Sequence, residues 1–263
     1  MKEDHKYSYS QLSQFDTCPY SFFLARIQGV PQIENAFAQQ GTLIHDLIDK
    51  WAKGEVKKET LAEEYVKRHV QEVTAPWPRM LAKKGYAEKA IEIGAKYFEQ
   101  FDCFAGYTIL ETEHRYETTI AGRPFVGIVD MVLKDEVTDE ILIVDHKSKS
   151  SAAFKKAADE MYRQQLLYAK FIKEKYGFFP DRMMFNLFKE NGEKHERPFT
   201  QDDYLDAMTW AEKTIQKIET YDDLDWLTCK EPDFFCKEIC SVHTSCPNGT
   251  PVYKKRISKG GVS

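Results

Sequence analysis

The chain has 263 residues, of which 42% are hydrophobic and 30% charged, and its net charge is −5. This composition is typical of a globular protein with a core, and it excludes a disordered chain, a collagen-like repeat and a protein with several membrane spans. No stretch approaches the roughly 20 apolar residues of a membrane helix, and the first residues lack the apolar centre of a secretory signal. We therefore expect a cytoplasmic protein without a membrane contact. The negative charge argues against a general nucleic-acid coat and still allows a local basic groove.

The first part of the chain is predicted to be helical. Apolar side chains at near-helical spacing favour helices over residues 8–28 and from Thr42 to Lys53, and Pro19 should start a new turn within the first of them. Residues 56–104 are also mostly helical in pattern, with two interruptions at proline and glycine.

The middle of the chain changes to the period-two pattern of strands. A hairpin, a short buried strand and a second hairpin around Asn191 and Gly192 are expected, and one long helix that ends at Gly177 separates the last two. In chain order the predicted elements are strands at Tyr107–Ile120, Arg123–Leu133 and Glu140–Val144, a helix from Ala152 to Tyr176, strands over 181–188 and 194–199, and a helix from Gln201 to Glu219.

The order of these elements indicates an α/β domain with a helical insertion. No internal repeat or low-complexity tract divides it. We expect one domain over residues 1–263, with a helical portion over 1–105, a catalytic αβ core over 106–200, and a final helix with a cysteine-rich tail over 201–263.

Two carboxylates interrupt apolar strands of the predicted core. Asp130 lies in VGIVDMVL, which is apolar on both faces, and Asp145 ends the apolar run ILIV. A buried carboxylate without a compensating cation costs several kcal/mol. Because the two strands are short and adjacent, we expect the two acids side by side at neighbouring strand ends. A divalent ion would relieve their repulsion, and hard oxygen ligands suit Mg²⁺ or Mn²⁺.

Lys147 completes a group of three. Alternation along the strand puts Lys147 on the face of Asp145 and His146 on the opposite face. A lysine beside a bound metal can orient or deprotonate a water and meet a phosphate oxygen, which is the outline of phosphodiester hydrolysis. The alternative is a structural ion pair between Asp145 and Lys147, with Asp130 capping a turn. Under the first interpretation, Lys147→Ala abolishes cleavage and leaves folding largely intact.

The segments GIVD, which ends at Asp130, and IVDHK, which ends at Lys147, resemble the PD-(D/E)XK nuclease superfamily, and in particular its RecB-like exonuclease branch. The resemblance spans roughly residues 8–250 and implies a metal-dependent DNA exonuclease with a restriction-endonuclease-like core, a mixed sheet flanked by helices. It also implies a metal held by Asp130, Asp145 and the backbone carbonyl of His146, with Lys147 activating the attacking water.

Two further metal-site residues follow from the resemblance. His45, in the segment GTLIH, is similar to an amino-terminal metal ligand of that branch, although a lone histidine on an apolar-striped helix is often structural. Glu113 matches an assisting acid on the strand before the first hairpin. Glu111 and Glu117 compete with it on the same strand face.

The helix after the lysine strand carries the last motif. Gln164 matches the glutamine of a Q-x-x-x-Y motif that ends at Tyr168, and it is expected near the catalytic lysine or the DNA, with Tyr168 in DNA binding. Gln165 is an adjacent competitor, but helical spacing favours Gln164 because it shares a face with Tyr168. The alternative is an exposed helix glutamine without a role.

Cysteines crowd the carboxyl-terminal tail. Cys236, Cys240 and Cys246 supply three soft ligands, one short of a usual metal site. In iron–sulfur members of the RecB-like branch one cysteine precedes the core and three follow it. Cys18 resembles the first, and the resemblance implies a [4Fe–4S] cluster that fastens the two ends of the chain. The first gap of the tail is one residue longer than is usual there, which leaves Zn²⁺ on the three tail cysteines and His243, or buried thiols, as alternatives.

Basic residues gather after the catalytic strand. Residues 147–175 hold eight Lys or Arg and three acids, whereas residues 202–225 hold eight acids and two lysines. A phosphate backbone is expected to run along such a basic helix, and Lys149, Lys155 and Lys156 are the predicted contacts, unless they are only a solvated face.

The resemblance also implies partners. DNA is the expected substrate, as a single strand or as duplex ends. No phosphate loop of the helicase kind is present, so unwinding would need a helicase or another DNA-processing protein. Similar chains serve CRISPR adaptation, repair and phage DNA processing, where the site of action is the host cytoplasm, and some are oligomers. A DNA-binding or scaffolding module with a nuclease fold and a small-molecule phosphodiesterase stay open as other classes.

Overall fold

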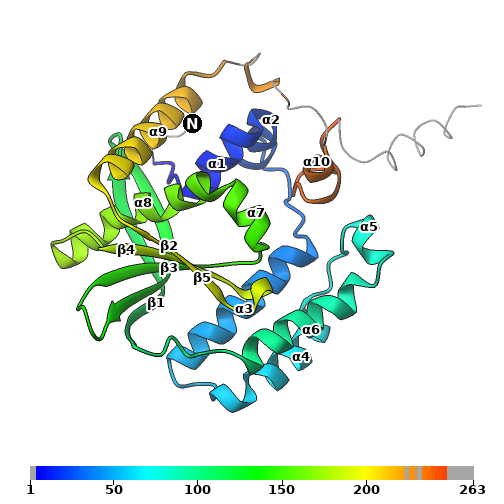
Figure 1. Ribbon diagram of the computed structural model, residues 1–263. Coiled ribbons are helices and arrows are strands. Elements are labelled where there is room, and N and C mark those ends of the chain that lie inside the picture. Colours follow the sequence, from blue (N-terminus) through cyan, green and yellow to red (C-terminus); the bar gives the residue numbers. More distant parts are fainter. Residues whose placement is uncertain (1–3, 223–224, 228, 230–232, 248–263) are drawn as a thin grey trace, which may run out of the picture.

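Five strands form one mixed sheet at the centre of the computed structural model (Figure 1). The structure describes residues 4–222, 225–227, 229 and 233–247. The strands are β1 (Tyr107–Ile120), β2 (Arg123–Asp135), β3 (Ile141–Lys147), β4 (Arg182–Leu187) and β5 (Glu193–Pro198). They lie in the order β1-β2-β3-β4-β5. β3 and β4 are parallel, and the other neighbouring pairs are antiparallel.

Helices cover both faces of the sheet (Figure 1). They are α1 (Tyr9–Thr17), α2 (Pro19–Phe22), α3 (Ala36–Ala52), α4 (Leu61–Glu72), α5 (Arg79–Ala82), α6 (Tyr86–Glu99), α7 (Ser151–Lys156), α8 (Ala158–Tyr176), α9 (Gln201–Thr220) and α10 (Phe234–Glu238). Apolar side chains of α1, α8 and α9 pack with one face of the sheet in a first core. Those of α3, α4 and α6 pack with the other face in a second core. The predicted α/β fold, a mixed sheet flanked by helices, is confirmed.

Local signals explain where the helices begin and end. The side chain of Asn35 accepts a hydrogen bond from the backbone N–H three residues later, at 3.1 Å, so α3 begins earlier than the predicted start at Thr42. Gly177 ends α8 in the left-handed conformation, with a φ of 84°, which glycine adopts without strain. The long helix predicted after β3 is two helices, because the chain leaves helical geometry at Ala157.

The amino-terminal segment is tied to the sheet before its first helix. Tyr7 donates its backbone N–H to the carbonyl oxygen of Pro124 at 2.9 Å and accepts from the N–H of Val126 at 2.8 Å. The helix predicted over residues 8–28 is α1, α2 and a π-helical turn at Phe23–Ile27, with the break at the start of α2 where proline was expected to cause it.

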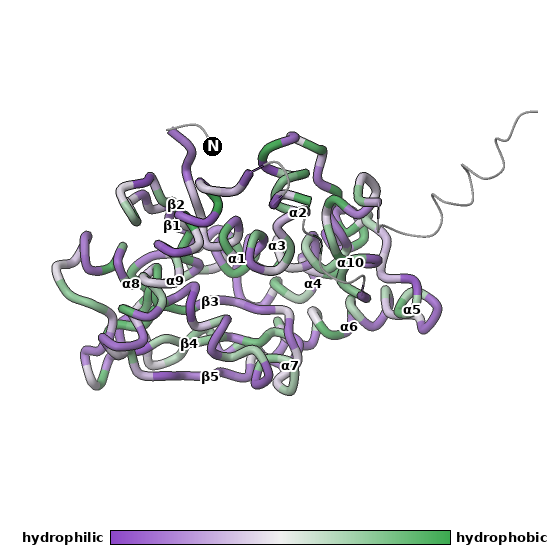
Figure 2. The backbone as a smooth tube through the Cα atoms, turned by 90° about the horizontal axis from the view of Figure 1, so that it is seen from above, coloured by the Kyte–Doolittle hydropathy of each residue, from purple (hydrophilic) through white to green (hydrophobic). Residues whose placement is uncertain are grey.

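The edge strand β5 and its inner neighbour β4 differ in character. β5 consists of the segment EKHERP and is hydrophilic along its length (Figure 2), whereas almost every residue of β4 is buried. A charged edge strand discourages pairing with the strands of other molecules. Within the part of the chain that the structure describes, no helix is both long and apolar enough to cross a membrane.

β2 and β3 pair over a short stretch only. Their pairs run from Met131 with Val144 to Lys134 with Ile141. Beyond the first of these pairs β2 continues alongside β1 alone, and β3 continues alongside β4 as far as Lys147. The sheet therefore forks where both strands reach their carboxylates, and backbone groups of β3 lose their strand partner there.

Candidate active site

Three carboxylates lie in a row across β1, β2 and β3. The register of β1 and β2 places Glu113 opposite Asp130. Met131 and Val144 are the last pair of β2 and β3, and Asp130 and Asp145 directly adjoin this pair at the fork. The three acids therefore come to one margin of the sheet.

Asp130 replaces the missing strand partner at the fork. Its Oδ2 accepts the backbone N–H of His146 at 2.8 Å. The carbonyl oxygen of His146 lies 3.0 Å from Nε2 of His45, on α3. The His146 ring points the other way, into the second core, where Nδ2 of Asn186 lies 3.0 Å from its Nδ1 and burial lowers its pKa well below the usual range. The backbone carbonyl of His146 thus faces His45, and its ring packs edge-on against the His45 ring with the centroids 5.3 Å apart.

His45, Glu113 and Asp130 form a group of ligand atoms. One atom from each lies within 4.8 Å of the other two, and among the described residues this is the only such group of His, Cys, Asp and Glu. Nδ1 of His45 is 3.2 Å from Oε1 of Glu113 and 3.5 Å from Oδ2 of Asp130. The spacing suits a single ion bound between the three side chains.

Glu113 has an unusual backbone. Its φ is 44°, in the left-handed region where non-glycine residues are strained, and such strain gathers at functional sites. The two competing acids of β1 are engaged elsewhere. Glu111 accepts hydrogen bonds from two tyrosine hydroxyls and pairs with a lysine, and Glu117 pairs with a lysine and an arginine at the surface. Of the three acids, Glu113 is the one that faces His45.

The site carries more negative charge than its own residues balance. Burial would lower the pKa of His45, but Asp130, Glu113 and Asp145 raise it to about 9. The carboxylates thus favour a cation at this position. A metal ion would supply that charge, and the imidazole binds it in the neutral form.

Lys147 lies between Asp145 and Gln164. Its Nζ is 2.9 Å from Oδ1 and 2.8 Å from Oδ2 of Asp145, and 3.2 Å from Oε1 of Gln164. The side chain of Asp145 is 5% exposed and that of Lys147 is 29% exposed. Burial raises the pKa of Asp145 to about 6. Burial acts to lower the pKa of Lys147, but the charges of Asp145 and Asp130 hold it above its usual value.

Gln164 and Gln165 have different surroundings. Gln164 donates its Nε2 hydrogen to the hydroxyl of Tyr168 at 3.4 Å and so links this ring to Lys147. Gln165 is buried and donates to the carbonyl oxygen of Met184 at 2.7 Å, which makes it part of the core. Tyr168 is 7% exposed, so its hydroxyl reaches the site while its ring is covered.

The residues present fit a divalent metal. Two carboxylates, one imidazole and the carbonyl oxygen of His146 converge, and hard oxygen donors with one nitrogen suit Mg²⁺ or Mn²⁺. Asp145 lies outside this tight group, and its buried Oδ2 is 2.8 Å from the Lys147 ammonium, which compensates its charge.

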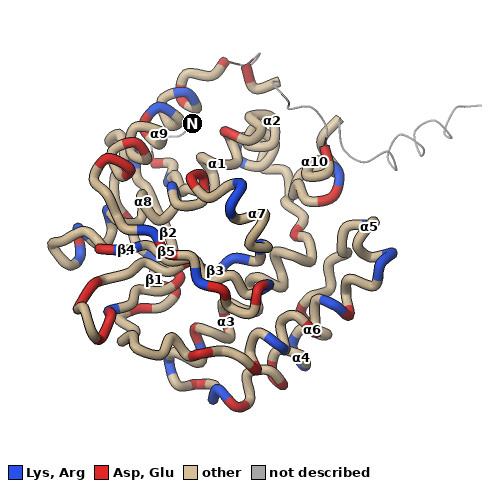
Figure 3. The backbone as a smooth tube through the Cα atoms, viewed as in Figure 1, with Lys and Arg blue, Asp and Glu red and all other residues tan. Residues whose placement is uncertain are grey.

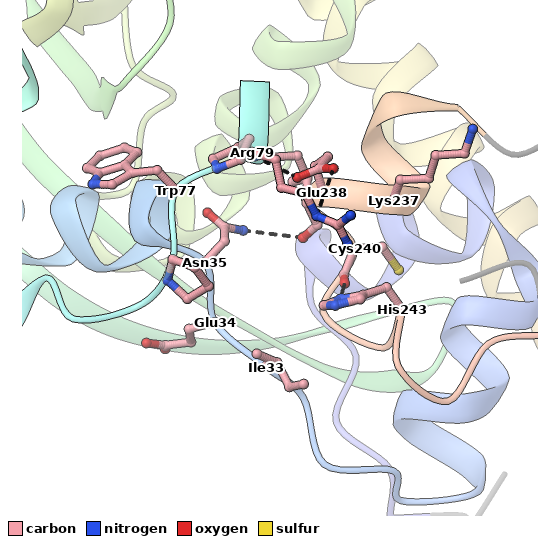
Figure 4. Close-up of a pocket in the computed structure, with 12 residues that line it drawn as sticks. Ile33, Glu34, Asn35, Trp77, Arg79, Lys237, Glu238, Cys240 and His243 are labelled. Atoms are coloured by element: carbon pink, nitrogen blue, oxygen red, sulfur yellow. Dashed lines mark hydrogen bonds and ion pairs between the residues drawn. The ribbon is translucent and has the colours of Figure 1, made fainter. Parts of the chain in front are cut away.

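The cysteine tail docks against the segment before α3. Nδ2 of Asn35 donates to the carbonyl oxygen of Ile239 at 3.2 Å. The ring of His243 turns back to the carbonyl oxygen of Cys240, which lies 2.8 Å from its Nδ1. Figure 4 shows these side chains around a small cavity of about 170 Å³ between the tail and the loop before α5.

The predicted cluster cysteines gather at this end of the molecule. Burial raises the pKa of the Cys240 thiol, and Cys236 and Cys18 lie near enough for their charge to raise it further. Cys240 and Cys246 pack against the same small apolar cluster. The zinc alternative needs the tail cysteines and His243 around one ion, and no three of their ligand atoms, all within the described residues, lie within 4.8 Å of one another.

The predicted DNA-contacting lysines are exposed. α7, the first helix after β3, carries basic residues (Figure 3); Lys155 and Lys156 are its last two residues, and Lys149 precedes it. None of the three lines the cavities that reach Lys147. They border the site in sequence and lie outside its walls.

Two cavities meet at Lys147. One, of about 590 Å³, has His45 and Glu113 in its wall. The other, of about 790 Å³, lies between α1, α8 and the cysteine tail and has Gln164 in its wall. No sequence motif marks the α1 hydroxyl residues that line the second cavity, which are Ser10, Ser13 and Thr17. Their signal is the spacing of three and then four residues between small hydroxyl side chains, which puts them on one face of the helix.

Comparisons with known proteins agree with this arrangement at the level of the family. The family model of the PD-(D/E)XK nuclease superfamily matches residues 6–247. No curated protein matches the chain.

Two of the solved structures that match are distant. One is described as "Putative exonuclease" from Eubacterium rectale, with 12% identity, 88% of this chain and 91% of that chain covered, and a TM-score of 0.49. The other, described as SSO0001, has 13% identity, covers 78% of this chain and 85% of that chain, and has a TM-score of 0.34.

Proposed function

The chain belongs to the PD-(D/E)XK nuclease superfamily, and from this premise we propose that it is a metal-dependent DNA exonuclease of the RecB-like branch that acts on single strands or DNA ends. The observation that carries the proposal is the group His45, Glu113 and Asp130, whose ligand atoms lie within 4.8 Å of one another. Without a metal these carboxylates would repel a phosphate. A protein that only binds DNA gains nothing from them.

Each side chain has a place in this chemistry. His45, Glu113, Asp130 and Asp145, with the carbonyl oxygen of His146, would hold Mn²⁺ or Mg²⁺. A bound divalent ion polarises a phosphoryl oxygen and lowers the pKa of a bound water.

Lys147 orients the attacking water or a phosphate oxygen beside the metal ligands. Asp145 and Gln164 hold its ammonium group in place through contacts of 2.8–3.2 Å. Gln164 is in turn held by Tyr168, so the amine has little freedom to leave the site.

The four cysteines are proposed as ligands of a [4Fe–4S] cluster. The support is that the tail packs against the amino-terminal segment and that Cys18 and Cys236, as well as Cys229, lie near enough to Cys240 to affect its pKa. A four-iron cluster spaces its thiolates more widely than a single zinc ion does, which agrees with the lack of a tight ligand group there among the described residues.

The central test compares Glu113→Gln with Glu117→Gln, the same chemical change on the same strand outside the site. Mn²⁺ binding is measured by calorimetry without DNA, and digestion of end-labelled linear single-stranded and duplex DNA is followed with Mn²⁺ or Mg²⁺ and with EDTA. We expect Glu113→Gln to bind Mn²⁺ about tenfold or more weakly and to lose digestion, since it removes a charged ligand. Glu117→Gln should behave as the unmodified protein.

Digestion by Glu113→Gln at the unmodified rate would contradict the proposed site. DNA binding by the unmodified protein without degradation in Mn²⁺ would favour a binding or scaffolding module. For the tail, bound iron with acid-labile sulfide supports the cluster, and zinc alone contradicts it.

A further inference from the structure

The cavity beside α1 opens onto the catalytic lysine from the side opposite the metal ligands. It has a volume of about 790 Å³, and its wall comes from α1, α8 and the cysteine tail. Of the described residues, Lys147 alone lines both this cavity and the one that contains His45 and Glu113. A phosphodiester placed at Lys147 therefore continues into one cavity on each side.

The two cavities differ in charge. The metal-side cavity has three carboxylates in its wall, from Asp46, Asp49 and Glu113. The α1-side cavity has one, from Glu160, and it also has the guanidinium of Arg26. Lysines pair with Asp46 and Asp49, and a divalent ion would offset Glu113, so what distinguishes the α1 side is its arginine, which suits the phosphates of a retained strand.

The α1 side offers hydrogen-bond donors suited to phosphate and sugar oxygens. Ser10, Ser13 and Thr17 follow one another along a single face of α1 and all line the cavity. Arg26 makes no ion pair with a described carboxylate, and its Nε contacts only the amide oxygen of Gln14, at 3.4 Å. Hydroxyls and arginines are common phosphate contacts in nucleic-acid complexes.

An aromatic ring stands at the same wall. Phe235, on α10, lines the cavity and is 42% exposed. Its neighbour Phe234 is 52% exposed and lines neither cavity. Stacking of a base on an exposed aromatic ring is typical of proteins that bind single strands.

From these observations we propose that the α1-side cavity binds a few nucleotides of single-stranded DNA next to the scissile phosphate, with Arg26 and the α1 hydroxyls on the backbone and Phe235 on a base. The inference rests on the proposed function and adds the path of the strand. The cavity has the volume of a site for one small ligand, which suits a few nucleotides of one strand better than stacked base pairs.

The experiment measures binding without cleavage. A fluorescein-labelled oligothymidylate of about 12 nucleotides is titrated with protein in EDTA, and fluorescence anisotropy is followed at several salt concentrations. Arg26→Ala and Phe235→Ala are compared with two matched controls, Arg115→Ala on the surface of β1 and Phe234→Ala. Ser13→Ala serves as a third cavity variant, and circular dichroism checks that all variants are folded.

We expect Arg26→Ala and Phe235→Ala to weaken binding about tenfold and the two controls to change it less than about twofold. Arg26→Ala should also flatten the slope of log K against log salt by about 0.7, the value for one phosphate contact on a single strand. A labelled blunt duplex should bind more weakly and should respond equally little to the cavity variants and the controls.

Three results would overturn the inference. The first is no binding of the single strand, and the second is equal binding by the cavity variants and the controls. The third is a duplex that binds as tightly as the single strand and loses as much affinity in the cavity variants. The proposed function fails separately. Binding through Arg26 and Phe235 without Mn²⁺-dependent degradation contradicts the nuclease and leaves the cavity as a strand-binding site. Degradation with unaffected binding by the cavity variants contradicts the strand path alone.

Discussion

Replacing Lys147 by methionine should destabilise the protein as well as inactivate it. Its ammonium lies 2.8 Å and 2.9 Å from the two carboxylate oxygens of Asp145, whose side chain is 5% exposed. Methionine keeps much of the volume of the side chain and removes its charge, so a buried carboxylate loses its cation. The pair adds a cost in stability to the expectation, drawn from the sequence, that loss of the lysine leaves folding largely intact.

The magnitude follows from burial. Removing one partner of a buried ion pair costs about 3–5 kcal/mol, and because Lys147 is 29% exposed the lower end, about 3 kcal/mol, is the better value. A domain has a net stability of about 5–15 kcal/mol, so the variant should stay folded. With a slope of about 3 kcal/mol per molar urea, its unfolding midpoint should fall by about 1 M.

The assay is urea unfolding in EDTA of the unmodified protein, Lys147→Met, Asp145→Asn and the double variant. The double variant should lose less than the sum of the single losses, with a coupling of about 2–3 kcal/mol, because neither charge is then left alone. Additive losses within about 0.5 kcal/mol, or a cost below about 1 kcal/mol for Lys147→Met, would refute the buried pair.

Three further predictions concern packing and pH. Gly94→Ala should lower the melting temperature although alanine is the better helix former by about 1 kcal/mol, because its Cβ would lie 2.1 Å from the ring of Tyr65; an unchanged or higher melting temperature contradicts this. Gly127→Ala should cost about 1–3 kcal/mol in urea unfolding, since its Cβ would lie 2.5 Å from the ring of Tyr168. Burial acts to raise the pKa of Glu111, but a lysine and two tyrosines hold it below the usual value. The stability that Glu111 adds is therefore complete above about pH 4.5 and is lost as the pH falls through its lower folded pKa. Glu111→Gln should be less stable than the unmodified protein at pH 7 and should approach its stability in acid. An equal difference in unfolding free energy at both pH values argues against this.

Much of the fold follows from local signals in the sequence. The alternation of apolar residues predicts the first hairpin, and the structure differs there only in that β2 runs on to Asp135. Gly177 marks the end of α8 because a left-handed residue stops a helix. β3 is longer than the apolar run suggests, since its pairing with β4 continues through Asp145 to Lys147.

The geometry of the site depends on contacts that no local pattern contains. Plain alternation would put Glu111 and Glu113 on the same face of β1, and the left-handed backbone at Glu113 is what breaks this alternation. The composition of the strand does not reveal such a residue. Helical spacing, by contrast, separates Gln164 from Gln165 from the sequence alone, because residues four apart lie on the same face of a helix and Gln164 is four residues before Tyr168. The role of Arg26 could not be predicted in this way, since it arises only when the cysteine tail folds back to close a cavity around α1.

The fork between β2 and β3 makes one amide of the backbone sensitive to the state of the active site. The N–H of His146 is protected by a side-chain oxygen of Asp130, not by a neighbouring strand. An amide held in this way exchanges with solvent at a rate that depends on how firmly that one carboxylate is fixed. Metal binding at Asp130 can thus be followed in an NMR spectrum of the resting protein, at the amide peak of His146 and without any turnover.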